Sequence, residues 1–172
     1  MTYKNNEFDS ETFENIDFTD KSFQNSSFTD CIFKNCNFPN ISVKNTKFHG
    51  VRFDGCKIVG MDFSECSSLL IDFEFTNSQI LMAIFSNIAI KETKFQSCRV
   101  EECEFKKTNL TEVVFNNCDL SRSNFSECIL MKSDFTTARN YNIDPITNKI
   151  KKAKFSIPEV VGLLHGFDIE IE

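Results

Sequence analysis

The sequence places large apolar residues at every fifth position, a spacing that fits neither an α-helix nor a simple β-strand. A helix buries a residue every three or four positions, and a half-buried strand buries every second one. Counting in fives from Phe8 to Phe63 meets only apolar residues, ten of the twelve being Phe. Counting from Phe75 to Phe135 gives thirteen further apolar positions. The chain is therefore built from a five-residue repeat, whose central apolar position is called i below.

The remaining positions of the repeat have their own composition. Position i−2 is small or medium, as at Ser26, Cys31 and Cys36, and all eight Cys fall on it if Cys66 is counted in the first series. Position i+2 is Asn, Asp or Gly throughout residues 15–60, and these residue types tolerate left-handed backbone. Positions i−2 and i lie on one side of an extended segment. Each repeat is expected to be a short extended edge followed by a corner, as in a β-solenoid.

The two series of apolar positions differ in phase by two residues. An insertion is therefore expected within SECSSLLIDFEF, residues 64–75. The sequence divides into a repeat domain at 1–140 and a distinct C-terminal region at 141–172.

The repeat resembles that of the pentapeptide-repeat family, which centres on Leu or Phe with a small residue two positions before. The resemblance covers roughly residues 6–140, where 25 central positions follow the pattern. It implies an all-β fold, a right-handed quadrilateral β-helix of about seven coils with four repeats per coil. Each residue would then stack on the residue one coil further along the chain.

This square coil predicts where the apolar side chains point. Phe23, Phe28, Phe33 and Phe38 should face inward from four successive walls. In the second half, Phe alternates with Ile, Val or Leu every ten residues, which is half a coil. Opposite walls are therefore expected to hold Phe75, Phe95, Phe115 and Phe135 on one side and Phe85, Phe105 and Phe125 on the other. Ile80, Val100 and Leu120 should line a third wall, and Ile90, Leu110 and Leu130 the fourth.

The C-terminal region follows other rules. Residues 141–149 are expected to form a projecting loop, after which Ile150 and Phe155 return to the repeat phase. Ser156 and Glu159 have the spacing of a capping box, which predicts a helix from Ile157 to His165 with Gly166 as its stop. Its buried face would contain Ile157, Val160, Val161 and Leu164. The alternation in FDIEIE predicts a short strand with Phe167, Ile169 and Ile171 on one side.

This helix would cover the open end of the solenoid, which otherwise exposes its core and its unpaired strand edges. The alternative is a homodimer interface formed by Val160, Val161, Leu164 and Phe167. Quinolone-resistance members of the family, which this layout resembles, pair through their C-terminal ends.

The sequence offers no evident catalytic, cofactor-binding or metal-binding residues. The Cys pairs are spaced by five rather than as C-x-x-C, and they would face a filled lumen, so core packing is expected rather than a zinc site. His49 and His165 are expected at the surface, away from any ligand cluster. No phosphate-binding, dinucleotide-binding, nucleophile-elbow or metalloprotease motif occurs. The sequence therefore indicates a protein that is not an enzyme and needs no cofactor.

Charge and hydropathy give expectations about partners and compartment. Residues 1–30 contain seven acids and two lysines, whereas residues 31–140 are balanced. Lys149, Lys151, Lys152 and Lys154 form a small basic cluster, interpreted as a solvated loop rather than a surface for direct nucleic-acid binding. The N-terminus lacks an apolar signal region, and no apolar run approaches the roughly 18 residues of a membrane span. A cytoplasmic protein with reduced thiols and no membrane contact is expected.

Two functions remain open. Leu81, Met82 and Ile84 occupy outward positions and could form an interaction patch, unless the inserted residues fold over them. The first hypothesis is a rod-like scaffold that binds an unidentified protein. The second is a DNA mimic that binds DNA gyrase or another type II topoisomerase and protects it from quinolones, as the family resemblance suggests. Mimicry requires acid along the rod, so a continuous negative wall would favour it and mixed walls would favour the scaffold.

Overall fold

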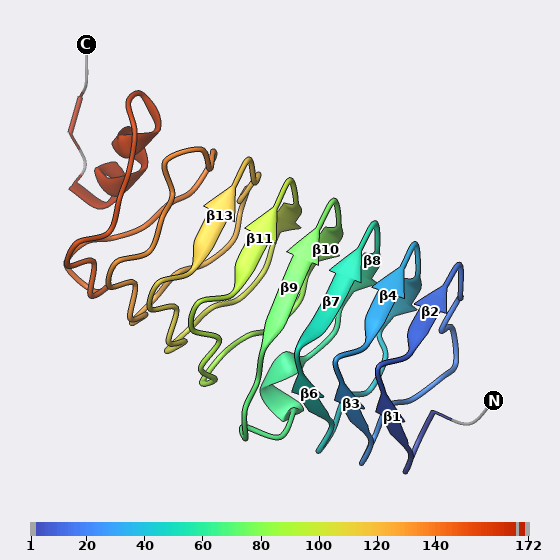
Figure 1. Ribbon diagram of the computed structural model, residues 1–172. Helices are drawn as coiled ribbons and strands as arrows, with labels where there is room; N and C mark the ends of the chain where they lie inside the picture. Colours follow the sequence, from blue (N-terminus) through green and yellow to red (C-terminus); the bar gives the residue numbers. More distant parts are fainter. Residues whose placement is uncertain (1–2, 168, 171–172) are drawn as a thin grey trace.

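The computed structural model describes residues 3–167 and 169–170, and it is a right-handed parallel β-helix (Figure 1). The chain visits four walls in turn, numbered here in chain order. Wall 1 begins as a sheet of β1 (Glu7–Asp9), β3 (Ser27–Thr29) and β6 (Lys47–His49), and it continues through Ile90, Leu110, Leu130 and Ile150. The β-solenoid that the five-residue repeat predicts, and the β-helix that the family resemblance implies, are confirmed.

The other walls are built in the same way. Wall 2 is a six-stranded sheet of β2 (Thr12–Glu14), β4 (Ile32–Lys34), β7 (Val51–Asp54), β9 (Phe73–Thr76), β11 (Lys94–Gln96) and β13 (Val114–Asn116). Wall 3 contains β5 (Asn37–Pro39), β8 (Lys57–Val59), β10 (Gln79–Leu81) and β12 (Arg99–Glu101). Wall 4 is held by isolated bridges such as Ser22 to Ser42 and Ile84 to Glu104, and it includes the 3₁₀ turn η1 (Phe63–Glu65). All strand pairs are parallel, so every coil rests on the next.

The inward rings form the core. The ring of Phe95 stacks on that of Phe115 at a centroid distance of 4.7 Å on wall 2, and Phe85 stacks on Phe105 at 5.0 Å on wall 4. Rings from these opposite walls meet edge to face, as Phe105 and Phe115 do at 85°. Aromatic pairs favour both of these geometries. The Phe residues at position i are buried throughout the repeat.

The register shows where the two extra residues enter. Phe33 pairs with Phe53 one coil later, whereas Phe53 pairs with Phe75, two residues further than the usual spacing. The backbone N–H of Ser67 still donates to the carbonyl of Thr46, as in the preceding coils. The extra residues therefore lie between Ser67 and Phe73. Leu69 and Leu70 in this loop point outward, with exposed fractions of 70 % and 73 %.

Phe73 compensates for the side chain that the loop turns away from the lumen. It occupies an i−2 position, where the repeat otherwise places a smaller side chain. Its ring is nevertheless buried, and its centroid lies 5.4 Å from that of Phe48 and 5.2 Å from that of Phe63. The larger ring thus fills the space that an inward residue of wall 1 occupies at other levels.

Residues 141–149 do not project as a loop. Tyr141, Ile143 and Asn148 are buried, and Phe125 bridges to Ile143 on wall 4. The Asn148 side chain donates to the carbonyl of Phe125 and accepts from the N–H of Cys128. The segment therefore forms part of the last coil. The distance along the chain from Phe125 to its bridge partner Ile143 is two residues shorter than the usual coil. The prediction was wrong because Ile143, and not Pro145, takes the inward position.

The expected C-terminal helix is also different in form. Two 3₁₀ segments, η2 (Glu159–Leu163) and η3 (His165–Phe167), replace one longer α-helix. No capping box forms, because the Ser156 hydroxyl donates to the carbonyl of Thr136 in the coil below, at 2.6 Å. No strand forms at 167–170 among the described residues, since Phe167 ends η3 and Ile169 is exposed. Ile171, assigned to the same strand, lies outside the described residues.

The first coil is closed by an aromatic residue that lies five positions before Phe8, in phase with the repeat. The ring of Tyr3 is buried, and its centroid lies 5.0–6.0 Å from those of Phe8, Phe13, Phe18 and Phe23. Because one ring touches all four inward rings of the first coil, Tyr3 closes the N-terminal end of the lumen.

Candidate interaction surfaces

The lumen is a packed core, and its thiols take part in holding the coils together. The eight Cys are free and buried. Several donate to a carbonyl of the preceding coil, as Cys56 Sγ does to Phe33 and Cys118 Sγ does to Phe95, both at 3.3 Å. Ser and Thr at the same repeat position do likewise, as Thr46 does to Phe23 at 2.7 Å. Position i−2 therefore selects small side chains that also satisfy a buried carbonyl.

Burial keeps Cys103 and Cys128 neutral. It raises the pKa of Cys103 to about 12 and that of Cys128 to about 11. A thiol reacts and binds metal as the thiolate, so these side chains are chemically quiet. Among residues 3–167 and 169–170, no group of three or more His, Cys, Asp or Glu is placed to hold a metal ion.

No helix within the described part of the chain has the length and apolar character needed to cross a membrane.

His49 ends β6 on wall 1, and His165 lies in the C-terminal segment, so the two histidines belong to different parts of the rod. Both are exposed.

The outward apolar group of Leu81, Met82 and Ile84 lies where walls 3 and 4 meet and is not covered by the inserted residues. Met82 is 51 % exposed and Ile84 37 %, while Leu81 is half-buried. The inserted loop follows η1 and leads into β9 of wall 2, so it leaves this group open. We call these three residues the Met82 patch.

An ion-pair cluster borders the Met82 patch. The carboxylate of Glu101 is buried and contacts the guanidinium groups of Arg99 and Arg122. Arg122 also contacts Glu102 at 2.7 Å. A shallow hollow of about 150 Å³ is lined by both groups, from Leu81 and Met82 to Arg122. Arg99 lies two residues before Glu101 on β12, and Arg122 comes from the next coil, so the cluster is complete only when the coils stack.

The C-terminal segment covers the last coil but leaves apolar side chains outside. Gly162 is buried, and its carbonyl accepts from the N–H of Ile143 at 3.2 Å. Val160 and Val161 are half-buried, whereas Leu164 and Phe167 are exposed. Ile157, expected on the buried face, is 89 % exposed. The segment therefore docks through Val160–Gly162 and presents Leu164 and Phe167 outward.

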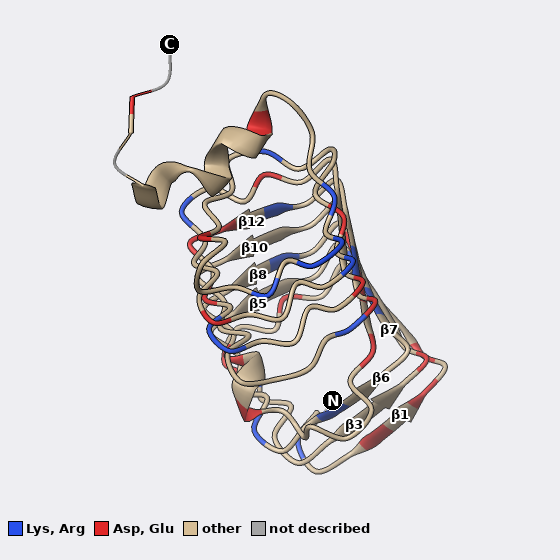
Figure 2. Ribbon diagram, turned by 90° about the vertical axis from the view of Figure 1, so that its left-hand side faces the viewer, with Lys and Arg blue, Asp and Glu red and all other residues tan. Residues whose placement is uncertain are grey.

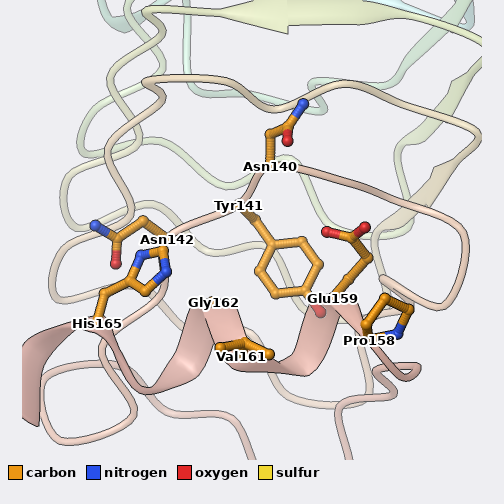
Figure 3. A pocket seen from close by; sticks show the side chains of 8 residues that line it. All are labelled: Asn140, Tyr141, Asn142, Pro158, Glu159, Val161, Gly162 and His165. Atoms are coloured by element: carbon orange, nitrogen blue, oxygen red, sulfur yellow. The ribbon is translucent and has the colours of Figure 1, made fainter. Parts of the chain in front are cut away.

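A cavity of about 450 Å³ lies between this segment and the last coil (Figure 3). The ring of Tyr141 lies between Asn142 and His165 on one side and Pro158 and Glu159 on the other. Within the described residues, the Tyr141 hydroxyl has no hydrogen-bond partner. Burial, with a smaller contribution from the charge of Glu159, raises the pKa of Tyr141 to about 12. The phenol therefore stays neutral, and sequence reasoning gave no sign of this site.

Acids and bases alternate around the rod (Figure 2). Ion pairs link successive coils on different walls, among them Arg52–Glu74, Lys107–Glu127, Lys132–Glu112, Arg139–Asp119 and Lys154–Asp134. Within the part of the chain that the structure describes, no wall is acidic along its whole length, and the N-terminal coil is the most acidic level.

Comparison with known proteins agrees with this architecture. Two family models match, the pentapeptide repeat region over residues 6–85 and pentapeptide repeats in eight copies over residues 98–136. No curated protein sequence matches the chain significantly.

Solved structures with a similar fold include two trypsin-treated variants of QnrB1, a plasmid-mediated fluoroquinolone resistance protein. The first is 16 % identical, with a TM-score of 0.69, and the alignment covers 99 % of this chain and 92 % of that one. The second has the same identity and a TM-score of 0.61, covering 99 % and 93 %. A pentapeptide repeat protein from the Arabidopsis thaliana thylakoid lumen aligns over 72 % of this chain and 70 % of its own, at 13 % identity and a TM-score of only 0.38. On the repeat, the fold and the two family models together, this chain belongs to the pentapeptide-repeat family.

Proposed function

We propose that this protein is a non-catalytic, rod-like scaffold that binds another protein, whose identity is open. The Met82 patch is the observation that supports this function best. An exposed apolar group beside a fixed set of charges resembles the anatomy of a protein interface, with apolar anchors and a polar rim. The core residues serve the fold, so the outward positions are left for binding.

The test is affinity capture of a partner protein. It compares the full chain with two variants of it. Met82→Asp combined with Ile84→Asp places charge on the Met82 patch without touching the core. Asn87→Asp, an exposed corner change in the same coil, is the matched control. A partner should be retained by the wild type and by the control and lost from the patch variant. Equal capture by all three proteins would remove the Met82 patch from the proposal.

A second candidate is the DNA mimic that binds DNA gyrase or another type II topoisomerase. The fold similarity to QnrB1 over nearly the whole chain favours testing it, as does the acidic first coil. The alternating charges elsewhere weaken it, because mimicry of a polyanion depends on continuous negative potential. A gyrase supercoiling assay, with and without a fluoroquinolone, tests this candidate directly. Neither inhibition nor protection at micromolar protein would eliminate it while leaving the scaffold proposal intact.

We also propose homodimer formation through the C-terminal end as a property to be tested. The exposed side chains of Leu164 and Phe167 support it, since an apolar end surface is stabilised by burial against a second copy. Leu164→Asp with Phe167→Asp should reduce the dimer fraction in sedimentation velocity. An unchanged dimer fraction would assign Leu164 and Phe167 to capping alone.

The eight free Cys support a reducing compartment, and we propose the cytoplasm. The proposal includes no cofactor, no membrane contact and no direct binding of nucleic acid. Fractionation of cells that express the full chain would test the compartment, and recovery in an oxidising compartment would contradict it.

A further inference from the structure

Wall 1 changes the sign of its charge from one end of the rod to the other. Its first crossing presents Glu7 and Asp9, and its second presents Asp30 at the corner. Its last two crossings present Lys132, Lys149, Lys151 and Lys152. All of these side chains are exposed, and Figure 2 shows the acidic residues of β1 at the N-terminal end.

The charges also occupy matched columns along the wall. Glu7 begins a column at position i−1 that pairs through Ser27 with Lys47, and Lys149 lies at the same position in the last crossing, bridged to Ile129. Asp9 and Lys151 share position i+1 of the first and last crossings. Asp30 and Lys132 share the corner position i+2, one level in from each end, and both have positive φ.

One two-fold operation brings these columns together. If a second copy faces wall 1 with its rod antiparallel, the first crossing of each copy meets the last crossing of the other, and columns are preserved. Glu7 then faces Lys149, Asp9 faces Lys151, and Asp30 faces Lys132, which also pairs with Glu112 of its own chain. Each of these contacts occurs twice. Further along, Lys47 faces the polar Asn109. In the crossings that are in register, no acid faces an acid and no lysine faces a lysine.

The middle of wall 1 supplies an apolar contact at the two-fold axis. The inserted loop lies between the third and fifth crossings, since it joins η1 on wall 4 to β9 on wall 2, and it exposes the apolar side chains of Leu69 and Leu70. Under the same operation this loop meets the loop of the other copy and the neighbouring crossing around Ala89, which is exposed. Apolar centre and charged ends are the arrangement of a self-complementary, isologous interface.

We propose that wall 1 is the docking surface for a second copy of this chain, in an antiparallel side-by-side homodimer. This inference goes beyond the scaffold function and uses neither the Met82 patch nor the C-terminal end. The contact is small, because the wall is only ~35 Å long at a coil spacing of ~4.8 Å. Interfaces of this size are transient, and the surface charges are screened within about 8 Å at physiological ionic strength. The dimer is therefore expected at low salt and at tens to hundreds of micromolar protein (order of magnitude).

The test is a charge swap followed by mixing, read by sedimentation velocity in low salt. All chains carry Leu164→Asp and Phe167→Asp, so that pairing through the C-terminal end does not contribute. One variant adds Glu7→Lys with Asp9→Lys, and the other adds Lys149→Glu with Lys151→Glu. Each alone should dimerise at least tenfold more weakly than the parent, because like charges then face each other at both ends. An equimolar mixture should recover the parent's affinity, since both ends again pair opposite charges.

Controls separate this outcome from a general effect of charge. Glu11→Lys with Glu14→Lys changes the same coil by the same amount on wall 2 and should leave the dimer unchanged. A short bismaleimide should cross-link Leu70→Cys across the two-fold axis but not Met82→Cys, which lies where walls 3 and 4 meet, and the native thiols are all buried. A parent that stays monomeric at low salt, or a mixture that fails to recover dimerisation, would overturn the proposal.

Discussion

Phe115 illustrates the packing on which each inward residue depends. Its ring stacks between those of Phe95 and Phe135, at centroid distances of 4.7 and 5.1 Å. It meets the rings of Phe105 and Phe125 edge to face, both at 85°. One side chain thus contacts rings on three levels and two opposite walls. A local shift of its neighbours cannot fill the space that its removal would leave.

We expect Phe115→Ala to lower the free energy of unfolding by about 3–5 kcal/mol, because it leaves a cavity in a close-packed lumen. Urea denaturation followed by circular dichroism measures the change. Val114→Ala, at the adjacent half-buried outward position, is the control and should change the stability by less than about 1 kcal/mol. Equal stability of the wild type and Phe115→Ala would contradict the inward assignment.

Asp119 is a carboxyl whose pKa makes the stability of the fold depend on pH in the acidic range. Burial would raise the pKa of this carboxyl, but hydrogen bonds from Asn140, Ser121 and Arg139 outweigh it and lower the pKa to about 2. Asn140 Nδ2 donates at 2.9 Å and Arg139 Nε at 3.3 Å. A carboxyl whose pKa is lower in the folded state stabilises the fold above its unfolded pKa of about 3.9 and loses that contribution as the pH falls.

The wild type should therefore lose thermal stability between about pH 4 and pH 2, and part of this loss should be absent in Asp119→Asn. Melting curves over this range provide the measurement. Glu127→Gln, which removes an exposed partner of Lys107, is the control and should keep the wild-type pH profile. A parallel profile for Asp119→Asn and wild type would show that another carboxyl is responsible.

At the scale of single elements, the corners show both the reach and the limit of sequence reasoning. Asn15, Asp30 and Gly50 were expected to turn because of their residue types, and all have positive φ. Met82 and Arg122 have the same backbone conformation, although neither residue type favours it. The coils above and below impose the turn there, so its position follows from the repeat phase and not from local propensity.

The prediction for the C-terminal region was wrong for a related reason. Local signals at Ser156 and Glu159 predicted a capped helix, but the hydroxyl of Ser156 is used by a carbonyl of the neighbouring coil. Ile143 takes an inward position two residues early, which a count in fives misses. Similarly, nothing near Phe73 signals that a large ring will replace a side chain of wall 1. These are tertiary effects, which depend on contacts between coils. The sequence shows only the local signals around each residue.

The C-terminal segment depends on a glycine where it crosses the last coil. A Cβ at residue 162 would overlap the carbonyl oxygen of Tyr141 and lie 2.9 Å from its Cδ2. Gly162→Ala should therefore lift η2 away while the coils stay folded. Limited trypsin digestion should cleave faster at Lys152 and Lys154, with an unchanged circular dichroism spectrum.

Gly166→Ala is the matched control for this change. A Cβ there would meet only Asp144 Cγ at 3.9 Å, an ordinary contact. Its digestion rate should equal that of the wild type. If both alanine variants are cleaved at the wild-type rate, the close contact at Tyr141 does not hold the segment in place.

For the molecule as a whole, the repeat determines which residues fill the lumen far more than it determines the contacts of the outward residues. Every fifth residue must fill the lumen, so a β-solenoid could be predicted from spacing, whereas its square, right-handed form was what the family resemblance implied. The outward positions obey no such rule, and the partners of Glu101, the cavity at Tyr141 and the charge columns of wall 1 arise only when coils are stacked. The Met82 patch could be predicted because apolar residues at outward positions break the pattern of the repeat.

The same stacking makes the ends of the rod the regions where stability is lowest. Each coil contacts only its neighbours, so stability is divided among coils and interfaces, and Tyr3 closes the first coil by contacting four inward rings. Tyr3→Ala should speed amide hydrogen exchange in residues 5–25 and leave the coils from 90 to 130 unchanged, because local opening stays near the missing ring. Lys4→Ala, an exposed neighbour, should exchange as the wild type does. Faster exchange along the entire rod would instead mean that the protein unfolds as one cooperative unit and that its ends and centre share a single stability.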